Sequence, residues 1–236
     1  MLQDQVRRRR PDQGYRRGEE TRARIISAAL ALFGENGFDG TSTRDVAARA
    51  EVNAPALQYY FGSKQGLYDA CIEHLQTNVL KRLEPALADA EAALERPAAA
   101  PEQLVAAYCT LLDELADFLI GSPDARSRAL FLAREQLSRG PDCATSELKK
   151  KFGKRFHRTC ITLTARIIGC DDADTLAELV AVTINGQLLF VHLGRQQLLE
   201  LLDWKDIARD RLARLKAIIR MQTIAIFAAH RAAAGA

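Results

Sequence analysis

Apolar residues recur at intervals of three and four along most of the chain, whereas strict alternation of apolar and polar residues is almost absent. The first spacing is typical of amphipathic helices, because it places the apolar side chains on one face of a helix. No internal repeat is evident. The sequence therefore predicts an all-α fold in which helices pack on helices.

Local signals predict four helices in the first third of the chain. The first, EETRARIISAALALFGENG, ends at the glycines of Gly34–Gly37. The second begins after Ser42, an N-cap residue, and Asp45 completes an acidic capping box. The third carries Pro55 in its first turn, where a missing N–H costs nothing. The fourth begins after Ser63 and runs over about 64–83. We expect these apolar side chains to hold the helices together: Ile25, Ala29, Leu32, Phe33, Phe38, Val46, Val52, Leu57 and Phe61.

The composition changes after Glu84-Pro85 to a segment rich in Ala, Pro and Glu, which predicts a short helix and a loop between Pro97 and Pro101. Five longer amphipathic helices follow, over about 102–120, 124–138, 144–169, 172–202 and 204–232. The expected domains are a flexible basic arm (1–17), a three-helix domain (18–66), a connecting helix (67–83) and a larger helical domain (84–236).

Composition is that of a globular protein, with 48% hydrophobic and 27% charged residues in 236. The formal net charge is only +3, but it is unevenly placed. Residues 1–24 carry eight arginines against four acids. Such an excess suits an arm that binds phosphates, and a solvated, disordered tail is the alternative.

The five cysteines are widely spaced, odd in number and free of CxxC pairs, which argues against a disulfide framework and against a zinc site. They favour a reducing compartment, and we expect a cytoplasmic protein. The longest uninterrupted apolar runs are far shorter than the roughly 20 residues that span a bilayer, so no membrane partner is predicted. Neither a phosphate-binding glycine loop nor a nucleophile motif is present, and we expect no enzyme activity, catalytic residues, cofactor or metal.

Residues 43–61 form two short predicted helices joined by a tight turn, with a longer helix before them that can brace them. That is the helix-turn-helix arrangement, whose second helix enters the major groove of DNA. A generic helical hairpin would show the same spacing.

Residues 21–67 strongly resemble the TetR family of bacterial transcriptional regulators. The resemblance rests on the stretch TRARIISAALALFGENGFDGTSTRDVAARAEVNAPALQYYFGSKQGLY, which ends at Tyr68. The remainder more weakly resembles the CecR-like subgroup, partly through REQLSRGPD at 134–142. The resemblance implies an N-terminal DNA-binding domain and a larger C-terminal domain that binds a small molecule and forms the dimer. One residue departs from the pattern: Glu51 stands where the family commonly has glycine, so the turn is either relaxed or mildly strained.

The resemblance gives the residues of 43–64 expected roles at DNA. Arg44 could reach a phosphate or a guanine edge, and Gln58 is expected to read a base, since an amide can bond adenine N6 and N7. Tyr59 and Tyr60 offer hydroxyls to the DNA backbone, although one of them can instead be partly core. Lys64 is expected to bind a phosphate. The remaining predicted contacts lie at the starts of the two helices: Thr43, Asn53, Ala54, Pro55 and Ala56.

In the larger domain, DTLAELVAVTINGQLLFVHLG (174–194) is apolar nearly all round, which predicts burial on more than one side. The last helix carries an apolar stripe, and two such helices per chain could form a four-helix dimer bundle or lie inside a monomer core. Polar residues within these apolar helices are the candidates for an effector pocket. They are Tyr108, Arg134, Gln136, His157, Asn185 and His192.

Together these features predict a homodimeric, ligand-responsive regulator that binds double-stranded DNA at a palindromic operator, most simply a repressor that a small-molecule effector releases. The resemblance to the CecR-like subgroup suggests control of drug export or drug sensitivity. Two alternatives remain: an architectural DNA-binding protein without an effector, and a small-molecule binder or enzyme with a vestigial helix-turn-helix.

Overall fold

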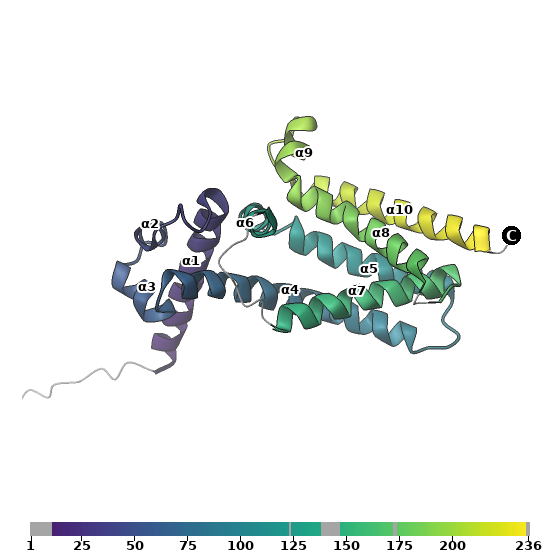
Figure 1. Cartoon of the computed structure of the whole chain (residues 1–236), viewed down its shortest axis with the longest axis horizontal. Helices are drawn as coiled ribbons and strands as arrows, with labels where there is room; N and C mark the ends of the chain where they lie inside the picture. Colours follow the sequence, from purple (N-terminus) through teal and green to yellow (C-terminus); the bar gives the residue numbers. More distant parts are fainter. Residues whose placement is uncertain (1–10, 123, 138–146, 172–173, 235–236) are drawn as a thin grey trace, which may run out of the picture. The chain divides into compact units, whose positions relative to one another are not determined.

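The computed structural model describes residues 11–122, 124–137, 147–171 and 174–234, and every regular element in these ranges is an α-helix (Figure 1). This confirms the predicted all-α fold. The chain divides into two compact units, the first ending at His74 and the second beginning at Leu75. The boundary falls inside one long helix, α4 (Lys64–Leu94), which contributes to both units.

The first unit contains α1 (Pro11–Asn36), α2 (Thr43–Arg49), α3 (Ala54–Phe61) and the first part of α4. The structure corrects the predicted basic arm, because its residues 11–17 belong to α1. Pro11 is a compatible first residue, since the first turn of a helix needs no intrahelical N–H bond. Residues 1–10, with the four consecutive arginines, lie outside the described part of the chain.

The core of the first unit follows the predicted apolar positions. Ile25, Ala29, Phe33, Val46 and Leu57 are buried. Leu32, Phe38, Val52 and Phe61, which the sequence also assigned to packing, are half-buried. An aromatic cluster closes one end of α1: the rings of Phe33, Phe38 and Tyr68 lie with centroids 5.1 to 5.9 Å apart. These contacts fix α1 against the start of α4.

Helix α4 runs through the predicted break at Glu84-Pro85, so the sequence was wrong to end it at Leu83. Proline inside a helix removes one backbone hydrogen bond, but its φ is compatible with helical geometry. The residues that follow keep the helical spacing of buried positions: Leu87 and Ala90 are fully buried in the core of the second unit. Tertiary burial therefore outweighs the local breaking signal.

The second unit adds six helices: α5 (Pro101–Leu119), α6 (Ala125–Leu137), α7 (Glu147–Ile168), α8 (Thr175–Leu193), α9 (Arg195–Leu201) and α10 (Arg209–Ala234). Helices α5, α7, α8 and α10 run roughly along one another and enclose the core (Figure 1). Its fully buried side chains include Leu104, Leu111, Leu163, Ile184 and Phe227. The second unit is thus a helical bundle in which helices far apart in sequence pack against one another.

The predicted helix over 172–202 is two helices, α8 and α9, which meet at Gly194. The backbone N–H of Gly194 donates to the carbonyl of Phe190 at 2.8 Å. A Cβ at Gly194 would lie 2.9 Å from that same oxygen, closer than real Cβ atoms approach. Glycine therefore permits the corner, and residues 174–194 and 195–201 take different directions.

By length and composition alone, α8 could cross a membrane, since its mean hydropathy reaches 1.5. The sequence analysis did not predict this candidate span, because it considered only uninterrupted apolar runs. The core helix of a soluble protein meets the same criteria. In this chain one face of α8 is buried in the bundle, with Val180, Ile184 and Leu188 inside. The opposite face carries exposed Leu179 and Phe190, so the expected burial on more than one side is not met within one chain.

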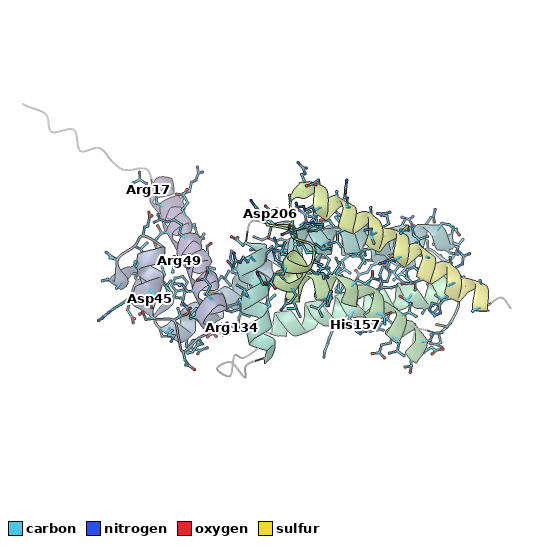
Figure 2. All side chains as sticks on the ribbon, turned by 90° about the horizontal axis from the view of Figure 1, so that it is seen from above. Arg17, Asp45, Arg49, Arg134, His157 and Asp206 are labelled. Carbon is cyan, nitrogen blue, oxygen red and sulfur yellow. The ribbon has the colours of Figure 1, made fainter. Side chains whose placement is uncertain are left out.

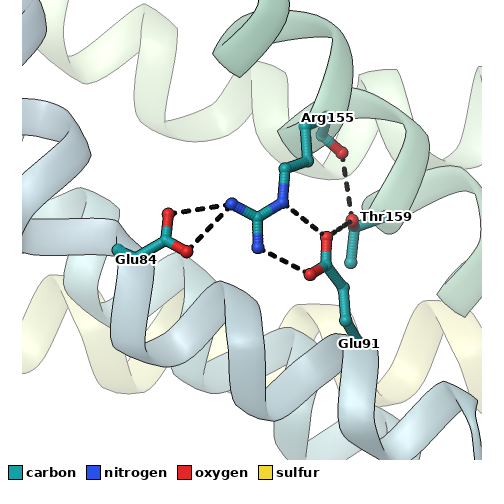
Figure 3. A network of polar contacts seen from close by, with 4 residues as sticks. All are labelled: Glu84, Glu91, Arg155 and Thr159. Atoms are coloured by element: carbon teal, nitrogen blue, oxygen red, sulfur yellow. Dashed lines mark hydrogen bonds and ion pairs between the residues drawn. The ribbon is translucent and has the colours of Figure 1, made fainter.

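A polar network joins α4 to α7 within the second unit (Figure 3). Arg155 of α7 donates to both Glu84 and Glu91, which lie seven residues apart on the same side of α4. Thr159, one turn after Arg155, donates to Glu91 as well. Four side chains from two helices therefore share one set of hydrogen bonds beside Pro85.

Candidate nucleic-acid interface

Helix α2 begins with the predicted capping box. The backbone N–H of Asp45 donates to Ser42 Oγ at 3.1 Å, and the backbone N–H of Ser42 donates to Asp45 Oδ2 at 3.1 Å. The Ser42 hydroxyl also donates to Asp45 Oδ2 at 2.6 Å. These hydrogen bonds from Ser42 lower the pKa of Asp45, because they stabilise its charged form. The start of α2 is therefore fixed by its own sequence.

The turn between α2 and α3 has the hydrogen bonds of a Schellman motif. Val52 N–H donates to the carbonyl of Ala47 at 3.0 Å, and Glu51 N–H donates to the carbonyl of Ala48 at 3.2 Å. This motif places Glu51 in the left-handed region, with φ of 53°. The mildly strained alternative is therefore the one the structure adopts, since a side chain here costs on the order of 1 kcal/mol relative to glycine.

Helix α3 begins at a side-chain cap. Asn53 Oδ1 accepts from the backbone N–H of Ala56 at 3.0 Å, so that oxygen and that N–H are occupied. Pro55 has no N–H to offer. Of the predicted phosphate-binding backbone N–H groups at this helix start, the cap therefore removes that of Ala56 and leaves those of Asn53 and Ala54. The small exposed side chains of Ala54 and Pro55 still permit close approach of a DNA backbone.

Gln58, Tyr59 and Arg44 are exposed on α3 and α2. Tyr59 is 83% exposed, whereas Leu57 beside it is buried and anchors the helix. Neither the amide of Gln58 nor the guanidinium of Arg44 has a side-chain partner among the residues that the structure describes. Their donors and acceptors are thus available to a ligand. Thr43, at the first position of α2, is half-buried.

Tyr60 is the tyrosine that belongs partly to the protein interior. It is half-buried, and a Cβ built at Gly18 of α1 would lie 3.6 Å from its hydroxyl. Two cations brace the same region. The Arg22 guanidinium lies 5.5 Å from the centroid of the Phe61 ring, and Lys64 Nζ lies 4.4 Å from that of Phe38. The C-terminal end of α3 is therefore held against α1, and the start of α4 is held against the segment that follows α1.

Residues 25–71 match the profile of "Bacterial regulatory proteins, tetR family", the span that contains this arrangement. Residues 104–230 match that of the "HTH-type transcriptional dual regulator CecR, C-terminal domain". The transcriptional dual regulator CecR of Shigella flexneri is 32% identical over 191 residues, which is 80% of this chain and 82% of that protein.

The chain belongs to the TetR family. It is a DNA-binding transcriptional regulator whose larger domain is of the CecR type, as the sequence resemblance predicted.

Other TetR-family relatives match shorter spans. The transcriptional repressor NicS of Pseudomonas putida is 30% identical over 52% of this chain and 51% of its own. Among solved structures, PfmR of Thermus thermophilus superposes with a TM-score of 0.56 at 19% identity, covering 86% of this chain and 94% of that one. FadR of Bacillus subtilis, in complex with stearoyl-CoA, gives 0.54 at 16% identity, covering 86% and 97%. These structural likenesses confirm the TetR-like fold.

In the larger domain the structure brings together two of the six residues predicted for an effector pocket. The hydroxyl of Tyr108 on α5 lies 3.2 Å from Asn185 Oδ1 and 3.4 Å from the carbonyl of Ala181, both on α8. Tyr108 is fully buried, and burial raises its pKa well above the ordinary value. The two side chains form a polar cluster in the bundle core, 77 residues apart in sequence.

His192 lies at another place, beside the end of α5. Its Nδ1 is 3.0 Å from the carbonyl of Leu119, which can only accept, so Nδ1 carries the proton and Nε2 is the unprotonated nitrogen. Burial lowers the pKa of His192 to about 4, and the charges of Arg128 and Arg195 act in the same direction. Nε2 is buried without a hydrogen-bond partner among the described residues.

The other three candidates lie apart from these two places. Figure 2 shows Arg134 and His157 on different helices, α6 and α7. Arg134 is exposed, and His157 Nε2 lies 3.9 Å from Glu178 Oε1. Gln136 is on α6, but its side chain lies outside the described part of the structure, as do residues 138–142 of the REQLSRGPD motif. The five candidates whose side chains the structure describes therefore do not form one site.

The structure shows a cavity of about 750 Å³ lined by none of these six residues. It lies between α6 and the α8–α9 corner, and Arg126, Arg195 and Trp204 are among its lining residues. Sequence reasoning missed them because it searched for polar residues inside apolar helices, whereas these three flank helix starts and a loop. The signal that could have found them is the pairing of helix-start arginines with the single tryptophan of the chain.

Proposed function

We propose that this regulator is a homodimeric repressor that binds a palindromic operator through α3 and is released by a small molecule bound in the second unit. The observation that carries the DNA-binding part is the free amide of exposed Gln58 on a helix that Asn53 caps and Leu57 anchors. A rigid element with an unengaged amide is suited to reading a base edge, since its geometry is fixed before DNA arrives.

Within this proposal, the predicted contacts divide into two groups. Gln58 specifies sequence, with Arg44 reaching a guanine edge or a phosphate. Tyr59, Lys64 and the starts of α2 and α3 position the protein on the DNA backbone without specifying sequence. Thr43, Asn53, Ala54 and Pro55 belong to the second group, as does Tyr60 through its hydroxyl, whereas Ala56 contacts a thymine methyl through its own methyl. The basic residues before α1 are a further candidate for phosphate contact.

The dimer is supported by the exposed apolar face of α8 and α10. Eight of the twelve large hydrophobic side chains that are exposed in the described ranges lie on these two helices. They are Leu176, Leu179, Val182, Leu189, Phe190, Ile218, Met221 and Ile224. A monomer rarely leaves so much apolar surface in water, so we expect the face to pair with a second copy in a four-helix bundle. Two recognition helices would then fit successive major grooves about 34–36 Å apart.

Repression rather than activation is supported by several relatives that are repressors, among them NicS and Rv3405c of Mycobacterium tuberculosis. The effector is expected to favour a conformer of the dimer whose recognition helices no longer fit the operator. By linkage, operator DNA must then weaken effector binding by the same factor. Control of drug export or drug sensitivity follows only from the CecR-like resemblance and stays a prediction.

The first test is a footprint of the purified protein on fragments of its own genome, including the DNA upstream of its gene, at a stated salt concentration. A few protected palindromes support the proposal, and the neighbouring genes then indicate which small molecules to test. Uniform, salt-sensitive protection contradicts it and favours the architectural alternative. For a molecule that releases the DNA, affinity is measured with and without operator, and equal affinities contradict the repressor mechanism.

A further inference from the structure

The cavity between α6 and the α8–α9 corner has two unlike walls. Residues of α6, of the corner and of the segment 203–206 line it, all within the second unit. A volume of about 750 Å³ is in the range of pockets that hold drug-sized ligands, about 300–1,000 Å³. Its chemistry therefore indicates what kind of molecule it would take.

The basic wall carries two arginines from different helices, Arg126 near the start of α6 and Arg195 at the start of α9. Neither guanidinium has a hydrogen bond or ion pair with any residue that the structure describes. Burial lowers the pKa of Arg195, the charge of Asp206 opposes this, and the charge of Arg126 adds to it. Two arginines close enough to repel, with ten N–H donors between them by chemistry, favour an anion.

Arg128, two residues after Arg126, adds to the positive charge beside this wall. It is buried, yet it donates only to neutral oxygens, the carbonyl of Phe118 and the hydroxyl of Ser122. Its Nε has no hydrogen-bond partner among the described residues. Among the described residues no carboxylate bonds directly to this buried cation, and the charge of Asp124 acts on it only from a distance.

The lining carries three acids, Glu200, Asp203 and Asp206, and three cations, Arg126, Arg195 and Lys205, so its formal charges balance. Glu200 accepts from Gln196 Nε2 at 2.9 Å on the same helix. The carboxylate of Asp206 lies 3.6 Å from Arg211 Nη1, and Arg211 also donates to the backbone carbonyl of Asp206 at 2.8 Å. Asp203 and Lys205 offset each other in formal charge. None of the three acids bonds to Arg126 or Arg195 among the described residues, so the guanidinium donors of both arginines remain open to a ligand.

The other wall is apolar. Leu130 of α6, Leu193 and Leu199 of the α8–α9 corner and Trp204 line it. The backbone N–H of Trp204 donates to the carbonyl of Leu199 at 2.8 Å, and the Arg211 guanidinium lies 4.8 Å from the centroid of its ring. The indole is therefore held in place, and a ligand's ring or chain can pack against this wall.

We propose that this cavity binds an anionic amphiphile, a small molecule with a carboxylate, sulfonate or similar group that Arg126 and Arg195 hold and an apolar body that packs on Trp204 and the leucines. The inference rests on the proposed role of the second unit as the effector domain, and it names the chemical class and the place of the effector.

The test compares two dyes that share an aromatic body and differ in charge. The first is 1-anilinonaphthalene-8-sulfonate, and the second is N-phenyl-1-naphthylamine, which lacks the sulfonate. Trp204 is the single tryptophan of the chain, so energy transfer from it to either dye reports binding near this cavity. The wild-type protein is expected to bind the anionic dye more tightly than the neutral one.

The decisive variant is Arg126→Gln combined with Arg195→Gln. Because both guanidinium groups would donate charge-assisted hydrogen bonds to the sulfonate, the affinity of this variant for the sulfonate dye should fall about tenfold or more, with little change for the neutral dye. Arg158→Gln is the matched control, since Arg158 is exposed on α7 and does not line the cavity. Circular dichroism checks folding, and the two single variants, each expected to show an intermediate loss, replace the double variant if it fails to fold.

Three outcomes overturn the inference: no energy transfer to either dye, unchanged affinity for the sulfonate dye in the variants, or equal loss for both dyes. Footprinting with the same proteins separates this inference from the proposed function. If dye binding depends on the arginines but the dye does not affect DNA binding, the anion site is supported and its role as the effector site is contradicted. If a molecule releases DNA equally from the wild type and the double variant, the repressor mechanism is supported and this cavity is not the effector site.

Discussion

Arg155 of α7 forms a bidentate pair with Glu91 of α4: Nε lies 2.8 Å from Oε1, and Nη2 lies 2.6 Å from Oε2. Its third nitrogen, Nη1, lies 2.9 Å from both carboxylate oxygens of Glu84 (Figure 3). The hydrogen bonds that Arg155 donates lower the pKa of Glu91, and the same bonds, accepted by Glu91 and Glu84, raise the pKa of Arg155. One guanidinium therefore joins two turns of α4 to α7.

Glu91→Gln should destabilise the second unit by about 1 kcal/mol, a modest loss because both side chains are more than a third exposed and solvent screens the pair. The folded pKa of Glu91 is depressed, so its stabilising effect is present above the unfolded value near 4.5 and is lost as pH falls through the folded pKa. Urea unfolding followed by Trp204 fluorescence should show the difference at pH 7 and its decrease in acid.

The matched control for Glu91 is Asp89→Asn, since Asp89 is exposed on the same helix and has no recorded partner. It should unfold at the same urea concentration as the wild type. A loss as large in Asp89→Asn as in Glu91→Gln would show that helix charge, and not the pair with Arg155, is responsible.

Glu51→Gly should stabilise the first unit by about 1 kcal/mol, because glycine adopts the left-handed conformation of this residue without a steric penalty. Glu51→Ala removes the charge but keeps the Cβ, so it should change stability little. Thermal unfolding followed by far-ultraviolet circular dichroism measures both. An equal gain in the two variants would assign the effect to the carboxylate instead of the backbone.

Gln58→Ala should weaken binding to the protected operator by about 1–3 kcal/mol and relax the preference at one base pair. The reason is that the amide of Gln58 has no partner among the residues that the structure describes, so its removal costs contacts with DNA and none of those seen inside the fold. Binding to a set of operators with each base pair changed in turn provides the measurement. An unaltered profile of base preference would remove Gln58 from the reading residues.

Lys64→Ala should weaken binding to all sequences by a similar factor and reduce the slope of log affinity against log salt by about one, as expected for one lost phosphate contact. It should also cost up to about 1 kcal/mol of stability, because the ammonium lies over the Phe38 ring. Lys64→Arg keeps both interactions and serves as the control. A change confined to one base position would contradict a phosphate role.

Leu179→Glu should convert the dimer to monomers at micromolar concentration and abolish tight operator binding, since a charge would be buried at the α8–α10 face. Leu201→Glu is the matched control: Leu201 is also exposed, at 81%, but lies on α9 outside that face. Sedimentation velocity distinguishes the two. If Leu201→Glu dissociates the protein and Leu179→Glu does not, the dimer forms elsewhere.

The sequence correctly predicted the features that depend only on residues close together along the chain. The cap of Ser42 with Asp45 and the start of α4 at Ser63 need only three or four residues of context. The prediction was wrong where distant packing wins, as at Pro85, where burial of Leu87 keeps α4 continuous. The pair of Tyr108 with Asn185 could not be derived, because periodicity fixes which face of a helix is apolar and not which helices meet.

The candidate DNA interface was easier to predict than the candidate pocket for the same reason. Arg44 and Gln58 lie within one contiguous motif, so their sequence spacing already implies their spatial relation. Arg126 and Arg195 meet at one cavity only because the corner at Gly194 brings α9 beside α6. No window of sequence contains both.

If the exposed face of α8 and α10 forms the dimer, the amount of protein in the cell affects how strongly it regulates its targets. In the proposed dimer, assembly obeys mass action, so at concentrations where monomers predominate the amount of dimer rises with the square of the amount of chain. Halving expression would then reduce operator-competent protein about fourfold. A gene dosage change too small to alter most enzymes could switch its targets.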